Sequence, residues 1–453
     1  MLQRKFSVEI EQCLTAREGK IMLVNGARQV GKSFIIREVG RRLFPHFIEI
    51  NLKEDAEGEG MFRNVRSTQD FYFRLGNFAG DGLGDSKDTL VFLDEIQAYP
   101  HLFTLLKFLR EEGRFRYIAS GSQLGVALAE TPSIPLGSID MRQMFPLDFE
   151  EFLWAVGTDR EWIERVKACF SRQESLTEDE HRMMMKRFRY YLLVGGLPEP
   201  VNRFLEDRNL VRVRQTQREI HELYRLDASQ YDAARRLKIR RIYDLIPSLL
   251  ENRKKRVVFK DIENKKGKDF ADYADEFEFL TNSGIALGVT AISNPVFPLV
   301  ESEHKNLIKL YINDVGILTG LLYGLNANAV LDDRVSVNLG SVYESVVAQE
   351  LHAHGFPLHY YDNKKRGEVD FLVDDFDTLS VLPVEVKSGK DYRIHASLDR
   401  FLSNGEYAIR RAIVFGNERE VRTEGKTVYM PVYYSMFLKH PNGEQGECIL
   451  PEL

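Results

Sequence analysis

The segment with the clearest chemical potential is Gly26-Ala27-Arg28-Gln29-Val30-Gly31-Lys32-Ser33, which has the spacing G-x-x-x-x-G-K-S. It follows the apolar run Ile21–Val24, so we expect a buried strand that turns into a helix here. The glycines allow successive backbone N–H groups to surround a triphosphate at a helix N-terminus. We expect Lys32 to contact the β- and γ-phosphates and the Ser33 hydroxyl to ligate Mg²⁺. The alternative is a glycine-rich turn without a ligand.

A second motif, Leu90-Val91-Phe92-Leu93-Asp94-Glu95, has four apolar residues that end in two acids. Sixty-one residues (94 minus 33) separate it from the loop serine, which leaves room for a helix and an intervening strand near Phe47–Ile50. We expect Asp94 to hold the Mg²⁺ through water and Glu95 to orient and deprotonate an attacking water. Alone the run is weak evidence, because many buried strands end in a solvated acid.

A third strand-like run, residues 115–119, ends in the polar residues Ser120-Gly121-Ser122-Gln123. Polar side chains at the tip of a neighbouring strand suit a sensor of the γ-phosphate or of the attacking water. Ser122 and Gln123 are the candidates for this role. An ordinary turn is the competing interpretation.

Two further segments, Gly367-Glu368-Val369-Asp370-Phe371-Leu372-Val373 and Pro383-Val384-Glu385-Val386-Lys387-Ser388-Gly389, have the pattern of strands. Fifteen residues separate Asp370 from Glu385, with a polar turn between them, so a hairpin would bring the two carboxylates together. In a strand, Glu385 and Lys387 share a face. Two carboxylates that bind Mg²⁺ and a lysine that steadies water are what metal-assisted phosphodiester hydrolysis requires.

A predicted amphipathic helix over residues 342–351 adds Glu344 as a third acid for this site. The competing interpretation makes Asp370, Glu385 and Lys387 an ion-paired trio on a sheet face. A buried pair of carboxylates without a metal or another cation would be costly. Both interpretations stay open at the level of the sequence.

The composition predicts a multidomain protein without a membrane segment. The chain has 453 residues, 43% hydrophobic and 29% charged, which is enough for several cores. No stretch approaches the roughly 20 apolar residues of a membrane helix, and the first residues lead into no apolar signal core. We therefore expect a cytoplasmic protein. The three cysteines are far apart and odd in number, which predicts neither a disulfide framework nor a zinc site.

The net charge of −6 hides a basic middle region. Residues 233–268 contain thirteen Lys or Arg and four acids, a local charge of +9 (13 minus 4). The cluster Arg253-Lys254-Lys255-Arg256 is the candidate surface for the phosphates of duplex DNA, through contacts that would be sensitive to salt and blind to sequence. A solvated charge run is the alternative.

The order of patterns predicts an α/β multidomain fold. Residues 1–150 alternate strands and loops as a parallel nucleotide-binding domain does, and residues 151–226 form a helical subdomain with a turn at residues 194–198. Residues 227–300 have a winged-helix-like order, with helices near 240–251 and 270–282 and strands at 257–259 and 285–292. Residues 301–453 carry the second acidic site. In the segment Leu310–Leu318, a helix cap by Asn313 or Asp314 is expected.

With these motifs together, the chain resembles predicted ATPases of the AAA superfamily that pair an ATP-binding domain with a C-terminal domain of unknown function, number 4143. The resemblance rests on G-A-R-Q-V-G-K-S, F-L-D-E-I-Q, the G-S-Q turn, P-L-D-F-E-E-F, L-Y-I-N-D-V-G-I-L, G-E-V-D-F-L and P-V-E-V-K-S-G. It implies a RecA-like ATPase core, a winged-helix region and a C-terminal domain similar to the PD-(D/E)xK nuclease fold. By this resemblance Asp370, Glu385 and Lys387 match the nuclease motif, with Glu344 on the helix before the sheet.

One position departs from that pattern. Many relatives have a Gly-Arg pair after the sensor turn, whereas here Gly137 is followed by Ser138 and the nearest basic residue is Arg142. An arginine that stabilises the γ-phosphate is therefore unassigned, and Arg142 is the candidate.

The sequence thus predicts a protein that binds and hydrolyses ATP with Mg²⁺ and has a DNA-facing C-terminal half. One alternative is a nuclease gated by ATP. The other is a nucleotide-dependent switch that binds a protein partner or forms a homo-oligomer. The expected catalytic residues are Lys32, Glu95, Asp370, Glu385 and Lys387. The expected metal ligands are Ser33, Asp94, Glu344, Asp370 and Glu385. The expected nucleotide-binding residues are Gly26, Ala27, Arg28, Gln29, Val30, Gly31, Lys32, Ser33, Asp94 and Ser122.

Overall fold

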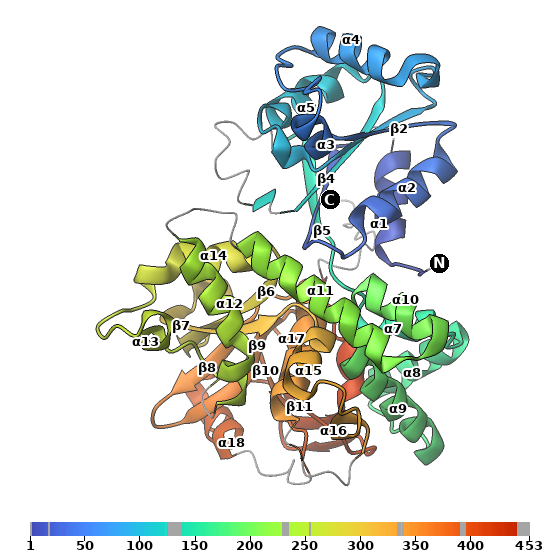
Figure 1. Cartoon of the computed structure of the whole chain (residues 1–453). Coiled ribbons are helices and arrows are strands. Elements are labelled where there is room, and N and C mark those ends of the chain that lie inside the picture. The colour runs from blue at the N-terminus through green and yellow to red at the C-terminus, as the bar shows by residue number, and fades with distance from the viewer. Residues whose placement is uncertain are drawn as a thin grey trace, which may run out of the picture. The chain divides into compact units, whose positions relative to one another are not determined.

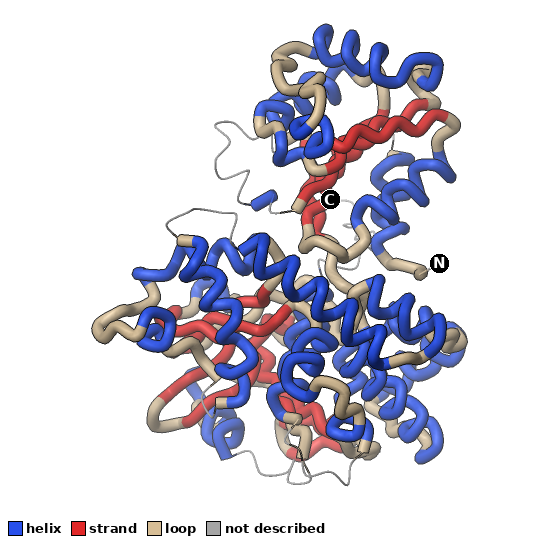
Figure 2. The backbone as a smooth tube through the Cα atoms, in the orientation of Figure 1, coloured by secondary structure: helices blue, strands red, loops and turns tan. Residues whose placement is uncertain are grey.

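The apolar runs that end in polar residues form the central strands of a parallel sheet. The computed structural model describes residues 2–16, 19–122, 124–125, 137–228, 235–252, 255–332, 337, 339–389 and 396–441. These residues divide into two compact units, one of residues 1–146 with 281–285 and one of residues 147–280 with 286–453. Figures 1 and 2 show both units as layers of helices against strands.

The first unit contains a five-stranded parallel sheet in the order β2-β3-β4-β1-β5. Its strands are β1 (Ile21–Asn25), β2 (His46–Asn51), β3 (Thr89–Asp94), β4 (Arg116–Gly121) and β5 (Ile139–Gln143). The predicted strands at residues 21–24, 47–50, 90–93 and 115–119 are confirmed. Since β4 lies between β1 and β3, the three polar strand ends predicted from the sequence meet at one edge of the sheet.

Helices cover both faces of this sheet (Figure 1). On one face lie α1 (Phe6–Thr15) and α2 (Lys32–Leu43). The other face packs against α3 (Leu52–Glu57), α4 (Thr68–Ala79) and α5 (His101–Glu112) through a core that includes Leu23, Leu93 and Phe103. Short 3₁₀ turns, η1 (Gly80–Gly82) and η2 (Ile96–Ala98), follow α4 and β3. Strands that are apolar on both sides are what a sheet covered on both faces requires.

The second unit begins with the predicted helical segment. Its helices are α7 (Phe149–Ala155), α8 (Arg160–Arg172), α9 (Glu178–Val194), α10 (Pro198–Asp207), α11 (Leu210–Ala228), α12 (Arg236–Glu251), α13 (Phe259–Glu263) and α14 (Ala274–Asn282). A 3₁₀ turn, η3 (Ala271–Tyr273), precedes α14. The turn expected at residues 194–198 separates α9 from α10 and is confirmed.

An eight-stranded mixed sheet in the order β12-β13-β11-β10-β9-β8-β6-β7 forms the rest of this unit. The strands are β6 (Ala286–Asn294), β7 (Glu303–Ile312), β8 (His359–Asn363), β9 (Gly367–Asp375), β10 (Ser380–Val386), β11 (Ala412–Gly416), β12 (Arg422–Glu424) and β13 (Thr427–Pro431). The predicted hairpin is confirmed, because β9 and β10 pair antiparallel with Val384 opposite Phe371.

Helices and short turns complete the second unit. They are η4 (Leu299–Glu301), α15 (Val315–Tyr323), α16 (Asn328–Leu331), α17 (Gly340–Ala353), α18 (Ala396–Leu402), η5 (Gly405–Tyr407) and η6 (Val432–Phe437). α18 packs on β9, whereas α17 packs on β6, β7 and β10. The prediction that residues 342–351 form an amphipathic helix is wrong in one respect. The helix exists, but every residue from Ser341 to Leu351 is buried because α17 is enclosed between the sheet and other helices.

Of the two strands expected in the winged-helix-like region, the one at residues 285–292 is present and the one at residues 257–259 is not. Residues 257 and 258 precede α13 and are not in a strand, although the Val257 N–H donates to the Ile308 carbonyl of β7 at 2.9 Å. The strand expected at residues 285–292 is β6, which pairs with β7 and β8 inside the eight-stranded sheet. β6 and β7 are consecutive antiparallel strands, and the pairing of β6 with the distant β8 makes both part of the larger sheet.

Two polar residues of the quoted motifs cap helices. Asp148 accepts a hydrogen bond from the Glu151 N–H at 2.8 Å at the start of α7. Asp314 accepts from the Ile317 N–H at 3.0 Å at the start of α15, which confirms the cap predicted for Asn313 or Asp314. Asp314 also accepts from the Gly196 N–H at 2.7 Å, so it joins α15 to the turn after α9.

Candidate functional site

The loop of residues 26–33 connects β1 to α2, and its two glycines adopt conformations that other residues rarely reach. Gly26 has φ +153°, and a Cβ there would lie 2.4 Å from the Met144 carbonyl oxygen. Gly31 has φ +99° and immediately precedes α2. The loop therefore ends at a helix N-terminus with free N–H groups, which is the environment that binds phosphate.

Arg4, which the sequence analysis did not select, holds this loop through hydrogen bonds to backbone carbonyls. The buried Arg4 guanidinium donates to the Val30 carbonyl at 3.0 Å and to the Phe145 carbonyl at 2.7 Å. One arginine thereby joins the phosphate loop to the chain that follows β5. The sequence gives no local signal for this role, since Arg4 lies 22 residues before Gly26 (26 minus 4).

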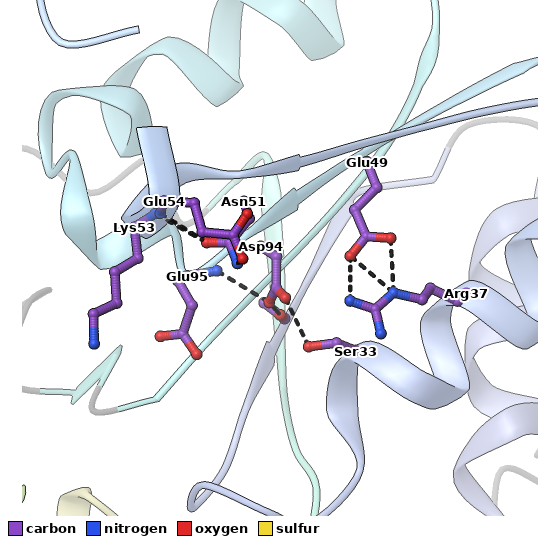
Figure 3. A network of polar contacts seen from close by, with 9 residues as sticks. Ser33, Arg37, Glu49, Asn51, Lys53, Glu54, Asp94 and Glu95 are labelled. Carbon is purple, nitrogen blue, oxygen red and sulfur yellow. Dashed lines mark hydrogen bonds and ion pairs between the residues drawn. The ribbon is translucent and has the colours of Figure 1, made fainter. Parts of the chain in front are cut away.

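The side chains of Ser33 and Asp94 are in contact, and the Lys32 side chain lies against the loop. The Lys32 ammonium donates to the carbonyls of Gly26 and Ala27 at 2.8 and 2.9 Å, so it lies on the inner side of the loop. The Ser33 hydroxyl donates to Oδ2 of Asp94 at 2.7 Å (Figure 3). The Ser120 hydroxyl, at the end of β4, donates to Oδ1 of the same carboxylate. A hydroxyl and a carboxylate are hard oxygen ligands of the kind that Mg²⁺ prefers, so these residues fit the predicted ion.

Glu95 follows Asp94 in a strained backbone conformation. Its φ is +53°, in the left-handed region, and its N–H donates to Oδ1 of Asp94 at 3.0 Å. Its carboxylate points away from Asp94 in Figure 3. The Ser122 hydroxyl lies 3.3 Å from Oε2 of Glu95, so the structure brings together the predicted base and the predicted sensor. Gln123 lies outside the described residues.

The end of β2 adds polar residues that the sequence reasoning did not select. Asn51 lies opposite Asp94 in the sheet and caps α3 by accepting from the N–H groups of Lys53 and Glu54 (Figure 3). Two residues earlier on β2, Glu49 forms an ion pair with Arg37 of α2. The Arg37 Nε lies 2.8 and 2.7 Å from the two carboxylate oxygens of Glu49. The sequence could have indicated Asn51, because β2 ends in a polar residue, as β3 and β4 do.

Arg142, the candidate for the missing arginine, pairs with acids of its own unit. Its Nε lies 3.0 Å from Asp140 on the same strand, and Nη1 lies 3.9 Å from Glu9 on α1. A role of Arg142 toward phosphate stays a prediction.

In the second unit, the hairpin and α17 bring the predicted acidic residues together. The Val386 N–H donates to Oδ2 of Asp370 at 2.9 Å, and the Lys387 ammonium lies 2.7 Å from Oε1 of Glu385. Burial and the neighbouring charge of Asp370 raise the pKa of Glu385 to about 8. The same two causes raise the pKa of Glu344 on α17. We call Glu344, Glu368, Asp370 and Glu385 the acidic cluster.

Lysines of the chain neutralise much of this acidic cluster. Lys255 pairs with Glu344, the fully buried Lys309 pairs with Glu368, and Lys387 pairs with Glu385. Within the part of the chain that the structure describes, no three His, Cys, Asp or Glu side chains are arranged to hold a metal ion. The ion-paired alternative therefore describes the arrangement of Glu385 and Lys387 well, and metal binding by Glu344, Asp370 and Glu385 stays a prediction.

The basic cluster predicted for DNA is partly accounted for by internal contacts. Lys255 pairs with Glu344, and the Arg256 guanidinium lies 2.9 Å from Asp362 at the end of the sheet. Arg253 and Lys254 lie outside the described residues. Two of the four basic side chains thus already have acidic partners within the second unit.

Three family models match separate parts of the chain. Residues 18–153 match the family described as an AAA domain. Residues 185–329 and 339–434 match domains of unknown function numbered 8612 and 4143. The chain thus combines an AAA-type domain with two domains of unknown function. The comparison with curated proteins gave no match.

The comparison with solved structures found a Walker-type ATPase of Pyrococcus abyssi, at 17% identity and a TM-score of 0.43, covering 71% of this chain and 96% of that one. Another is the Aeropyrum pernix ORC1 protein in complex with DNA, at 14% identity and a TM-score of 0.29, covering 70% and 90%. Among the described residues, no helix combines the length and apolar character needed to cross a membrane.

Proposed function

We propose that the first unit binds ATP with Mg²⁺ and hydrolyses it. The observation that carries this proposal is the 2.7 Å contact between Ser33 Oγ and Asp94 Oδ2 at the carboxyl edge of the parallel sheet. This edge is where open α/β sheets bind their ligands. The match to an AAA domain over residues 18–153 supports the same assignment.

In this proposal the loop N–H groups and the Lys32 ammonium bind the β- and γ-phosphates. Ser33 and Asp94 would hold Mg²⁺, and the bound ion would neutralise charge that develops on the phosphate oxygens. Glu95 accepts the proton of the attacking water, and the Ser122 hydroxyl donates to Oε2 of the Glu95 carboxylate. Each role uses a side chain whose position at the sheet edge is given by β1, β3 or β4.

The test compares two lysine variants of the first unit. Lys32→Ala removes the ammonium group that is proposed to bind the phosphates. Lys107→Ala instead removes an exposed lysine side chain of α5. We expect Lys32→Ala to lose ATP binding and phosphate release and Lys107→Ala to keep both. Equal phosphate release by the two variants would overturn the proposal, because hydrolysis would then not use the phosphate loop.

A second candidate function is metal-dependent phosphodiester hydrolysis at the acidic cluster. The observation that favours it is the juxtaposition of Asp370, Glu385 and Lys387, with Asp370 bonded to the backbone of Val386 beside Glu385. The lysine pairs weaken the case for a bound ion. Asp370→Asn should abolish any Mg²⁺-dependent cleavage of DNA or RNA and spare ATP turnover. Absence of cleavage in the native chain would remove this candidate.

The DNA-facing role of the second unit remains part of the proposal, and it rests on the basic composition of residues 233–268. ATP turnover measured with and without duplex DNA tests it, with a charge reversal of residues 253–256 as the comparison. We expect DNA to raise turnover of the native chain and not of the variant. If turnover ignores DNA, the nucleotide-dependent switch with a protein partner becomes the better proposal.

A further inference from the structure

Gln97 connects the proposed base to the proposed sensor. It lies in the η2 turn, two residues after Glu95, and its Nε2 donates to Oε2 of Glu95. The same amide nitrogen lies 3.3 Å from the Ser122 hydroxyl. Ser122 in turn lies 3.3 Å from Glu95. The three side chains therefore form a closed triangle of contacts around one carboxylate oxygen.

The orientation of the Gln97 amide is fixed by its surroundings. Its Oε1 is buried and has no hydrogen-bond partner among the described residues. This oxygen packs against Gly121 so closely that a Cβ there would lie only 2.2 Å away. Rotating the amide by half a turn would point its oxygen at the Glu95 carboxylate, which is repulsive. The nitrogen must therefore face Glu95.

This arrangement is locally unfavourable in two ways. A buried acceptor without a partner loses its hydrogen bonds to water and gains none in return. A non-glycine residue in the left-handed region, as Glu95 is with φ +53°, is also in a sparsely populated conformation. Strain of this kind gathers at sites where geometry is needed for function. Here both features serve one result, which is a fixed position of the Glu95 carboxylate.

We propose that Gln97 is a positioning residue that holds Glu95 in the orientation needed to accept the proton of the attacking water. This inference rests on the proposed ATP hydrolysis and adds a residue to it. Gln97 acts through Glu95 and needs no contact with ATP. Without the amide donor, the carboxylate can rotate among several rotamers, and fewer of them point at the water.

The test replaces Gln97 by Met, which keeps the length and removes the donor. A matched control, Gln12→Met, changes an exposed glutamine of α1 in the same unit. We expect Gln97→Met to lower kcat by on the order of tenfold to a hundredfold with the KM for ATP unchanged. Gln12→Met should match the native chain. Thermal unfolding and binding of a non-hydrolysable ATP analogue verify that Gln97→Met is folded.

A double variant separates positioning from a general structural role. In the Glu95→Gln background the base is already lost, so adding Gln97→Met should cause no further loss of kcat. Equal losses in both backgrounds would overturn the inference, as would a Gln97→Met variant with native kcat. If the native chain releases no phosphate from ATP, the proposed function fails instead, which distinguishes the two failures.

Discussion

Ser33 and Asp94 lie 61 residues apart in the sequence, and their side chains touch, with Oγ 2.7 Å from Oδ2. The contact joins the first turn of α2 to the end of β3 across a sheet in which β4 lies between β1 and β3. Ser120 at the end of β4 donates to the same carboxylate. Residues of α2, β3 and β4 thus come together at one carboxylate.

Loss of the Asp94 carboxylate should abolish metal-dependent turnover and leave the fold intact. The Ser33 and Ser120 hydroxyls donate to different oxygens of Asp94, so in Asp94→Asn one of them keeps an acceptor oxygen and the other must rotate to accept from the amide nitrogen. The negative charge that attracts Mg²⁺ is lost. We expect kcat to fall by at least about a hundredfold. Treatment of the native chain with EDTA should lower the rate of phosphate release to the same extent, and addition of Mg²⁺ should restore it. Phosphate release is the measurement, and turnover that persists in EDTA would contradict the metal assignment.

Gly26→Ala should disrupt the phosphate loop. The new Cβ would lie 2.4 Å from the Met144 carbonyl, and this backbone group cannot move without distorting the loop. We expect a loss of about 1–3 kcal/mol in the free energy of unfolding and a loss of ATP binding.

The matched control is Gly76→Ala, which adds a methyl in open space inside α4. It should leave binding unchanged and stabilise the helix by about 0.5–1 kcal/mol. Thermal unfolding and binding of a fluorescent ATP analogue are the measurements. A Gly26→Ala variant that binds like Gly76→Ala would contradict the described loop geometry.

Asp314 should make stability depend on pH. Burial raises the pKa of this carboxyl to about 6, although the N–H groups of Gly196 and Ile317 oppose the shift. The folded state therefore holds the proton more tightly than the unfolded state, whose Asp has a pKa of about 3.9. The stabilising contribution is complete at low pH and is lost as the pH rises through about 6.

Asp314→Asn keeps an acceptor oxygen but cannot titrate. Relative to this variant, the native chain should lose about 1 kcal/mol of unfolding free energy between pH 5 and pH 8. Urea unfolding at both pH values is the measurement. Parallel changes in the two proteins would show that Asp314 does not titrate in this range.

Lys309 should be important for the stability of the second unit. Its side chain is fully buried, pairs with Glu368 and lies 4.6 Å from the centre of the Tyr360 ring. Lys309→Met leaves Glu368 without its cation, and because Glu368 is partly exposed we expect a loss of about 2 kcal/mol. The double variant Lys309→Met with Glu368→Gln should recover most of it. The measurement is thermal unfolding of both variants. A double variant less stable than the single one would contradict the stabilising role of the ion pair.

The sequence predicted the nucleotide-binding unit well because its signals are local. Apolar runs such as residues 90–93 are buried strands, and the polar residue after each marks the edge where strands of a parallel sheet end. Ser33, Asp94, Glu95 and Ser122 could therefore be selected before any coordinates. Arg4 could not, because the Val30 and Phe145 carbonyls that it contacts are distant in the sequence, and the contact of Gln97 with Ser122 could not, because it depends on the packing of η2 against β4.

The second unit was harder to predict because its sheet is built from distant segments. β6 pairs in parallel with β8, with Thr290 opposite His359, and nothing in the local pattern near residue 290 specifies that partner. Lys255 and Lys309 pair with Glu344 and Glu368 of distant elements, so these contacts could not be predicted, whereas the pair of Lys387 and Glu385 followed from their spacing in one strand. The hairpin of β9 and β10 was predictable because both strands and their turn are adjacent in the sequence.

The most direct test of the account is a comparison of Glu95→Gln with the native chain. The variant keeps the shape of the side chain and loses the base, whereas Lys32, Ser33 and Asp94 remain. The account predicts that Glu95→Gln binds ATP with Mg²⁺ as tightly as the native chain and releases phosphate at least about a hundredfold more slowly. If this variant releases phosphate at the native rate, Glu95 is not the base of ATP hydrolysis.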